Sequence, residues 1–499
     1  MICNKSSFQS SLVYHFLAAI LLATFCSSQA AAQYGETAPI AESLKPGYDA
    51  ISSEQCKEWL SLLAGEKFAG RGTGQPGYTK AAHWVSGKLA EFGVEPMGNG
   101  GSYFQMLPMT RKIPVPADCK IEGPGGLEIS GEDDLGFSRY SEQAQVGGKI
   151  ALVTMAGDNP QFAGGVSLRD KVVILLTDDD SDFRKQIPII RQQPAAVIMV
   201  AEKPESQSQL VRGGRTRTPG TWSSISPDAA NRLMDSLGVE RSWLEGPTED
   251  GGNVTDIDAE VRVTVRLREE QVVVPNVIGW LEGSDPEVND EYIVLGAHLD
   301  HLGTRGDELF NGADDNASGS TAILNVAKAM SENPVKPRRS VMFMWFAAEE
   351  IGLVGSRYYT DNPTQPLEKC ICMFNCDMVG RNEETQEETA AENEGSIHLV
   401  GSRKGDENLH NIIMDANRSI GFRFEYDQEG VFGRSDQANF YRAGIPVAFL
   451  FGGFHPDYHR TGDDIEKINY KKVASAARLF YLSIYKAAEF GEFARVPQQ

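Results

Sequence analysis

The sequence has little positive charge for its length. Its 499 residues include 47 Lys and Arg against 69 Asp and Glu, which gives a formal net charge of −22. A chain this acidic is repelled by phosphate backbones and by anionic lipid surfaces, so nucleic acid and membrane surfaces are disfavoured as partners. The length exceeds that of one ordinary domain, and we expect two hydrophobic cores.

Long apolar runs are also scarce. The run Phe16–Ala23 is too short to span a bilayer comfortably, and the small residues Ala30–Ala32 follow it. This order is typical of a cleavable signal peptide, so we expect residues 1–32 to be removed and the protein to be secreted or periplasmic. Cys26 leaves a lipid anchor open, although the bulky residue before it favours plain secretion. No later run is long enough for a membrane helix.

The sequence also lacks two common metal-binding patterns, the zinc ribbon and the EF-hand loop. Of the seven cysteines, five follow residue 32, and their spacing is not that of a zinc ribbon. A thiolate zinc site at Cys370 and Cys372 is conceivable, but buried apolar thiols or one disulfide are the better interpretation. The acidic stretch Thr177–Asp182 lacks the spaced ligands and the glycine of an EF-hand loop, which favours a solvated turn over a calcium site.

Strands that alternate with helices predict an α/β fold with a mostly parallel central sheet and helices on both faces. The texture changes at about residue 117, where short apolar runs begin to alternate with Gly and Asp turns, and it changes back near residue 265. We therefore expect a small mixed α/β domain, inserted into a larger one. The predicted division is a signal peptide at 1–32, a first segment of the larger domain at 33–116, the inserted domain at 117–265, and a second segment at 266–499.

Histidine and carboxylate side chains gather where the predicted strands end. The apolar strand Tyr292–Ala297 leads directly to His298 and Asp300, and a glycine-rich loop then brings Asp314 and Asp315. In an open α/β sheet this edge is where ligands bind. A lone Asp after a strand is usually a cap or a turn, but the same pattern recurs three more times. The later residues are Glu349 and Glu350 after strand 341–347, Asp377 after strand 371–375, and His459 on a loop. Imidazole and carboxylate groups together indicate a metal site with N and O ligands.

With these motifs the chain resembles the co-catalytic di-zinc aminopeptidase family, which also includes the glutamate carboxypeptidases and the glutaminyl cyclases. The motifs are AHLDH, GADDNASG, FAAEEIGLVGS, NCDMVGR and DYHRTGDD. The likeness covers residues 52–109 and 272–499 and implies a zinc exopeptidase fold of the phosphorylase/hydrolase-like type. The segment between them looks like a protease-associated domain, mainly through SLRDKVVILL and PAAVIMV.

The resemblance implies a role for each matching residue. Asp314 would bridge two zinc ions and would be joined to Asp315 by a cis peptide bond. Glu349 would be the general base, and Asp300 would orient a zinc ligand. Tyr458 would either donate to the oxyanion or be a packed aromatic residue. The implied zinc ligands are His298, Asp314, Glu350, Asp377 and His459, and the nearby His301 and His455 are surplus to this set.

The implied function is a secreted or periplasmic di-zinc metallo-aminopeptidase that acts on peptides with a free N-terminus. Three carboxylates would largely offset two dications, and the remaining charge of about +1 would lower the pKa of a water towards ~7. A carboxypeptidase for acidic dipeptides is the main alternative. A glutaminyl cyclase would use one zinc, and a non-catalytic relative would lack ligands or the base. The arginines that could hold a substrate carboxylate are Arg381, Arg403, Arg434 and Arg460. The oligomeric state and the preferred N-terminal residue stay open.

Overall fold

The computed structural model describes residues 38–140, 144–157, 160–162, 167–178, 183–212, 220–247 and 250–497. The predicted signal peptide at 1–32 lies outside these ranges, as do residues 179–182 of the acidic turn. The chain divides into two compact units, one from Met1–Leu107 with Val274–Gln499 and the other from Pro108–Val273. The two boundaries fall within strands β2 (Phe104–Pro114) and β12 (Leu267–Leu281), whereas the sequence placed them at 117 and 265.

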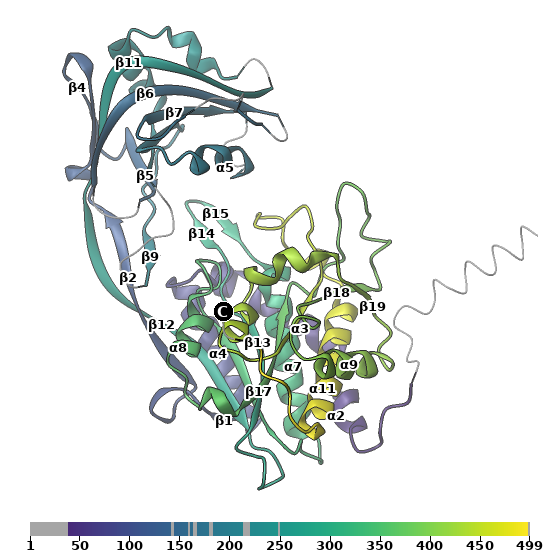
Figure 1. The fold of residues 1–499 in the computed structure, drawn as a ribbon. Coiled ribbons are helices and arrows are strands. Elements are labelled where there is room, and N and C mark those ends of the chain that lie inside the picture. Colours follow the sequence, from purple (N-terminus) through teal and green to yellow (C-terminus); the bar gives the residue numbers. More distant parts are fainter. Residues whose placement is uncertain are drawn as a thin grey trace, which may run out of the picture. The chain divides into compact units, whose positions relative to one another are not determined.

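A mixed sheet forms the centre of the larger unit (Figure 1). Strands β16 (Ser340–Phe346), β13 (Tyr292–His298), β17 (Cys370–Asp377) and β20 (Val447–Phe451) pair in parallel in that order. β12 pairs antiparallel with β16, and β18 (Ser396–Val400) pairs antiparallel with β20 and parallel with β19 (Arg423–Glu425). The α/β class is thus confirmed, but the sheet is mixed rather than mostly parallel. The apolar pattern of a strand carries no information about its direction, which is why the flanking strands were not distinguished.

The parallel strands are buried on both faces, as the continuous apolar runs predict. Every residue of β13 and β16 is buried. On one face, Tyr292 and Val294 share a core with Tyr359 of α8 and Phe440 of α10, whose rings stack 5.7 Å apart. On the other face, Phe374 of β17 packs edge-on against Phe480 of α11. The helices of this unit are α2 (Lys45–Ala50), α3 (Ser53–Leu63), α4 (Pro76–Glu91), α7 (Gly319–Glu332), α8 (Val354–Asp361), α9 (Glu407–Asn417), α10 (Gln437–Arg442) and α11 (Tyr470–Glu489).

The smaller unit has its own eight-stranded sheet, in the order β4-β3-β11-β6-β7-β8-β10-β5 (Figure 1). Helix α5 (Phe183–Arg191) supplies Ile189 to one hydrophobic core, and α6 (Pro227–Leu237) supplies Leu233 and Met234 to another. Two cores of its own are what an independently folding domain needs. Its strands are β3 (Lys120–Gly123), β4 (Leu127–Ser130), β5 (Leu135–Arg139), β6 (Ala144–Ala156), β7 (Val172–Thr177), β8 (Ala196–Val200), β10 (Thr221–Ile225) and β11 (Gly251–Val265), and β9 (Gln209–Val211) pairs with the end of β2.

All five cysteines of the described residues are buried and free. The interpretation as buried apolar thiols is therefore confirmed, and none of them forms the disulfide that was the alternative. Within the described ranges, no helix combines the length and the apolar character needed to cross a bilayer.

Candidate metal centre

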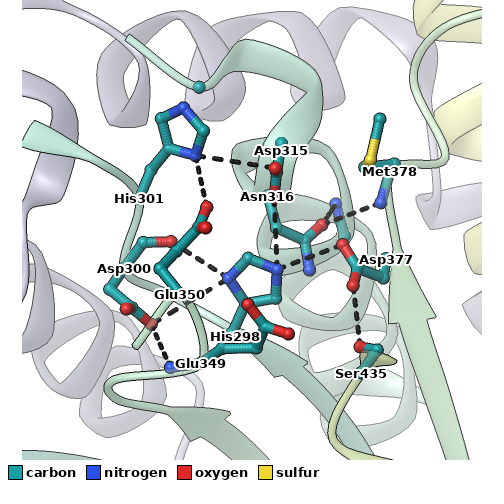
Figure 2. Close-up of polar contacts among 12 residues, drawn as sticks. His298, Asp300, His301, Asp315, Asn316, Glu349, Glu350, Asp377, Met378 and Ser435 are labelled. Atoms are coloured by element: carbon teal, nitrogen blue, oxygen red, sulfur yellow. Dashed lines mark hydrogen bonds and ion pairs between the residues drawn. The ribbon is translucent and has the colours of Figure 1, made fainter. Parts of the chain in front are cut away.

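Four of the five predicted ligands come together at the carboxyl edge of the parallel strands, and Figure 2 shows three of them, His298, Glu350 and Asp377. His298 is the last residue of β13 and Asp377 is the last residue of β17, its parallel neighbour. Glu349 and Glu350 follow the end of β16, the neighbour on the other side. Because parallel strands end at one edge, residues far apart in sequence come together there, as the pattern predicted.

His298 is the centre of a first group of ligand atoms. Its Nε2 lies 3.1 Å from Oδ1 of Asp377 and 3.3 Å from Oδ1 of Asp315, and all three side chains are buried. Its Nδ1 lies 3.0 Å from the carbonyl oxygen of Asp300. A carbonyl oxygen can only accept, so Nδ1 carries the proton and Nε2 is the nitrogen available to a metal.

A second group lies beside it, around Glu350. Oε2 of Glu350 and Oδ2 of Asp315 lie 3.1 and 3.2 Å from Nε2 of His459. His301, which the sequence analysis treated as surplus, places Nδ1 2.7 Å from Oε1 of Glu350. The side chain of His459 is 37% exposed whereas that of His298 is 1% exposed, so the centre opens to solvent at His459.

Asp315, not the predicted Asp314, stands between the two groups. Asp315 turns one oxygen to each group, as described above. Asp314 faces away, because its Oδ1 accepts hydrogen bonds from the backbone N–H groups of Gly380 and Arg381 at 2.6 and 3.1 Å. The cis peptide bond is also one residue later than expected, between Asp315 and Asn316. The assignment of Asp314 as bridging ligand is therefore corrected to Asp315.

The donor set fits a pair of zinc ions. The ligand atoms of His298, Asp315 and Asp377 lie within 4.8 Å of one another, and so do those of His301, Asp315 and Glu350. Imidazole nitrogens and carboxylate oxygens are the ligands that zinc accepts when no thiolate is present. One carboxylate shared by two such groups is the arrangement that a two-metal site requires.

The pKa values of the two adjacent glutamates are shifted in opposite directions. Burial raises the pKa of Glu349 well above its usual value; His298 opposes this shift, and repulsion from Glu350 adds to it. Burial and Asp315 also act to raise the pKa of Glu350, but His459 and His301 outweigh them and lower it to about 2. Neighbouring carboxyl groups whose pKa values are driven apart suit different tasks, a proton carrier and a permanent anion.

Three non-glycine residues at the centre have left-handed backbones. Ala348 (φ 59°) precedes Glu349, Met378 (φ 51°) follows Asp377, and His459 itself has φ 57°. Such residues are uncommon and cluster at functional sites, where the surroundings over-determine the backbone. No sequence pattern predicts these three backbones, because none of the residues is glycine or asparagine.

The two remaining predicted residues lie at the centre. The Asp300 carboxylate accepts hydrogen bonds from Oγ1 of Thr73 at 2.6 Å and from the N–H of Glu349 at 3.2 Å, but is 3.9 Å from the His298 ring. It therefore holds Glu349, while its own backbone carbonyl orients His298. The ring of Tyr458 stacks on His459, 3.9 Å between centroids, and its hydroxyl accepts a hydrogen bond from Arg434 at 3.1 Å.

Comparisons with known proteins agree with this geometry. Residues 276–483 match Peptidase family M28. Leupeptin-inactivating enzyme 1 of Streptomyces exfoliatus is 34% identical over 193 residues, 38% of this chain and 38% of that protein. Leucine aminopeptidase 2 of Arthroderma otae is 28% identical over 287 residues, 50% of this chain and 52% of that protein. The chain thus spans between about two fifths and one half of the length of these curated relatives.

Solved structures show the same fold. An aminopeptidase from Aneurinibacillus sp. strain AM-1 has a TM-score of 0.55 at 20% identity, over 90% of this chain and 97% of that one. The zinc aminopeptidase BSAP from Bacillus subtilis has a TM-score of 0.55 at 19% identity, over 88% and 95% of the two chains. The family resemblance predicted from the motifs is confirmed by these comparisons, since residues 276–483 match Peptidase family M28.

Proposed function

We propose that this protein is a zinc-dependent aminopeptidase that removes N-terminal residues from peptides. The observation that carries the proposal is the pair of N/O ligand groups that share Asp315, with the buried Glu349 beside them. The named relatives that match the chain, a leucine aminopeptidase and a leupeptin-inactivating enzyme, support the same activity.

The ligands of one zinc would be His298 and Asp377, those of the other Glu350 and His459, and Asp315 would bridge. When bound, the two ions would polarise a peptide carbonyl and lower the pKa of a water molecule. Glu349 would take up a proton and return it to the leaving amine, a step for which a raised carboxyl pKa is suited. Asp300 holds Glu349 in place for this through the backbone N–H.

A free α-amino group is the substrate feature that the centre favours. Carboxylates at the centre that do not bind zinc can accept a hydrogen bond from the ammonium group of a substrate. Such a charge-assisted hydrogen bond is roughly twice as strong as a neutral one. Two of the four arginines proposed for a carboxypeptidase are engaged elsewhere. Arg381 pairs with Asp457 at 3.1 Å, and the guanidinium of Arg403 lies 3.5 Å from the Tyr426 ring centre.

Arg434 favours the carboxypeptidase alternative, because it donates to Tyr458 at the exposed side of the centre. The test compares a leucyl dipeptide amide with its N-acetylated form and with the same dipeptide that ends in a free carboxylate. We expect acetylation to abolish cleavage and the C-terminal group to matter little. The reverse pattern would establish a carboxypeptidase and refute the aminopeptidase proposal.

Metal content is measured on the same preparation. We expect two zinc ions per chain at the centre, and one ion there would favour a glutaminyl cyclase. A protein that binds both ions but cleaves none of these substrates would instead be a non-catalytic relative.

We also propose that Pro108–Val273 is a protease-associated domain of a secreted or periplasmic protein. The two segments that resemble such a domain form β7 and β8, adjacent parallel strands in the sheet of this unit. Secretion is supported by the signal-peptide pattern at residues 1–32. Sequencing the N-terminus of protein exported by its native host tests this, with Gln33 expected as the first residue.

A further inference from the structure

A separate cluster of side chains that could bind a metal lies at one end of the sheet of the larger unit, around β18 and β19. Glu383 follows β17 in the chain, His398 lies on β18, and Glu425 is the last residue of β19. One ligand atom from each of the three lies within 4.8 Å of the others. None of these residues belongs to the centre described above.

The cluster is buried. His398 is 1% exposed, Glu383 is 4% exposed, and the side chain of Glu425 is 24% exposed. Burying a carboxylate such as that of Glu383 is unfavourable unless a cation or hydrogen-bond donors lie beside it.

The distances around His398 match a coordination sphere. Its Nε2 lies 3.0 Å from Oε2 of Glu383 and 3.8 Å from Oε2 of Glu425. Two ligands of a tetrahedral zinc, each about 2.1 Å from the ion, are separated by ~3.4 Å. The two measured distances lie on either side of this value.

The opposite ring nitrogen lies near a carboxylate, the kind of group that a metal-bound histidine uses as a partner. Nδ1 of His398 lies 3.1 Å from Oδ1 of Asp427, although it makes no aligned hydrogen bond. Histidines that bind a metal through one nitrogen almost always direct the other N–H to a carboxylate or a carbonyl. The carboxylate of Asp427 therefore lies on one side of the His398 ring, and the oxygens of the two glutamates lie on the other.

The remaining oxygens of the two glutamates are taken by protein donors. Oε1 of Glu425 accepts from Arg423 at 3.2 Å, and Oε1 of Glu383 accepts from the side chain of Gln428 at 3.4 Å. Each carboxylate thus keeps only its Oε2 for the space beside His398. The buried ammonium of Lys472 does not fill that space, because it donates to the carbonyl of Arg381 at 2.9 Å.

We propose that Glu383, His398 and Glu425 bind a structural divalent transition metal, with zinc as the best match. An imidazole with two carboxylate oxygens suits zinc, whereas calcium takes six to eight oxygen ligands. The ion would tie the segment after β17 to the two edge strands. That segment also contacts the loop before His455, since the N–H of Glu384 donates to the carbonyl of Phe454 at 2.9 Å.

The experiment compares bound zinc per chain in the full-length protein and in variants, after removal of loose metal and titration with zinc. We expect His398→Gln and Glu425→Gln each to bind one zinc fewer than the wild type, and to lose the rise in Tm that this zinc produces. His410→Gln is the matched control, because the Nδ1 of His410 faces the hydroxyl of Ser402 and no carboxylate. It should retain the full zinc content.

A His298→Gln variant separates this proposal from the proposed function, because it removes a ligand of the other centre only. If His298→Gln lowers the zinc content and His398→Gln does not, the inference is overturned and His398 is a protonated partner of the two glutamates. Glu425 is partly exposed, so Glu425→Gln decides the matter if His398→Gln fails to fold. A zinc content equal to the wild type in Glu425→Gln, with Tm equally responsive to zinc, also overturns the proposal.

Discussion

Exchanging Glu349 for Gln tests the division of labour between the two adjacent glutamates. The substitution keeps the volume of the side chain and its backbone N–H bond to Asp300, but removes the group that can carry a proton. Loss of a general base typically lowers kcat by ~10²–10⁴-fold, which is about 2.7–5.4 kcal/mol in the activation barrier. The side chain of Glu349 makes no ion pair with His301 or His459, so both zinc ions should remain.

Glu350→Gln is the matched control, since it changes the next residue in the same way. Here the carboxylate lies 2.7 Å from His301 and 3.1 Å from His459, and its pKa is lowered to about 2. This variant should bind less zinc at the His459 group, and raising the zinc concentration should restore part of its activity.

The assay is kcat and KM for a leucyl amide, measured with bound zinc on the same samples. A zinc-replete Glu349→Gln with kcat within about threefold of wild type would refute the assigned role, since a lost general base costs far more. Equal zinc loss in both variants would show that Glu349 is a ligand and not a base.

Three more predictions follow from individual contacts. Asp315→Asn should abolish the binding of at least one zinc, because Asp315 turns one oxygen to each ligand group. Asp314→Asn should retain both zinc ions, because the carboxylate of Asp314 accepts backbone N–H groups instead. The reverse result in a metal titration would restore Asp314 as the bridging ligand. Tyr458→Phe should leave zinc content and KM unchanged but lower kcat by ~10²–10³-fold. The reason is that the Tyr458 hydroxyl accepts a hydrogen bond from Arg434, which leaves its own proton to donate to an oxyanion. An unchanged kcat would make Tyr458 a packing residue. Burial raises the pKa of Asp300 to about 6, above its value in the unfolded chain, so the protonated form favours folding and this stability is lost as the pH rises through about 6. In zinc-free protein, denaturant titration should show wild type losing about 2 kcal/mol relative to Asp300→Asn between pH 4 and 6. Parallel stability curves for the two proteins would contradict this.

Strands and helices with one clear pattern could be predicted from the sequence. The buried run 292–297 became β13, and Ser52 caps α3 by accepting from the N–H of Gln55 at 3.1 Å. Direction within the sheet could not be predicted, because β12 and β18 have the same apolar character as the parallel strands between them. The division of the structure into two units lies within β2 and β12, which have no change of pattern at residues 107 and 273, so the sequence offers no signal for it.

The centre was predicted down to the motif but not always to the residue. Asp314 and Asp315 are adjacent in one loop, where no periodicity determines which side chain faces inward. His301 is in the same motif as His298, but beyond the strand end, so its orientation depends on distant contacts. Its backbone N–H donates to the carbonyl of Arg71 at 3.3 Å, a contact across more than two hundred residues that no local pattern encodes.

Two buried charges of opposite sign hold these loops in position. The guanidinium of Arg71 is fully buried and donates to the carbonyls of Leu299 and Gly312, which flank the loop between His301 and the aspartate pair. Asp463 accepts the N–H groups of Asp314 and Asp315, at 3.0 Å in each case. Leu299 directly follows the ligand His298, and Asp315 supplies the shared carboxylate, so both contacts hold backbone next to a ligand side chain. Because a planar guanidinium and a carboxylate each fix several backbone groups at once, the ligands are positioned by residues that bind no metal. The N-terminal segment that contains Arg71 therefore contributes to the centre although it supplies no ligand.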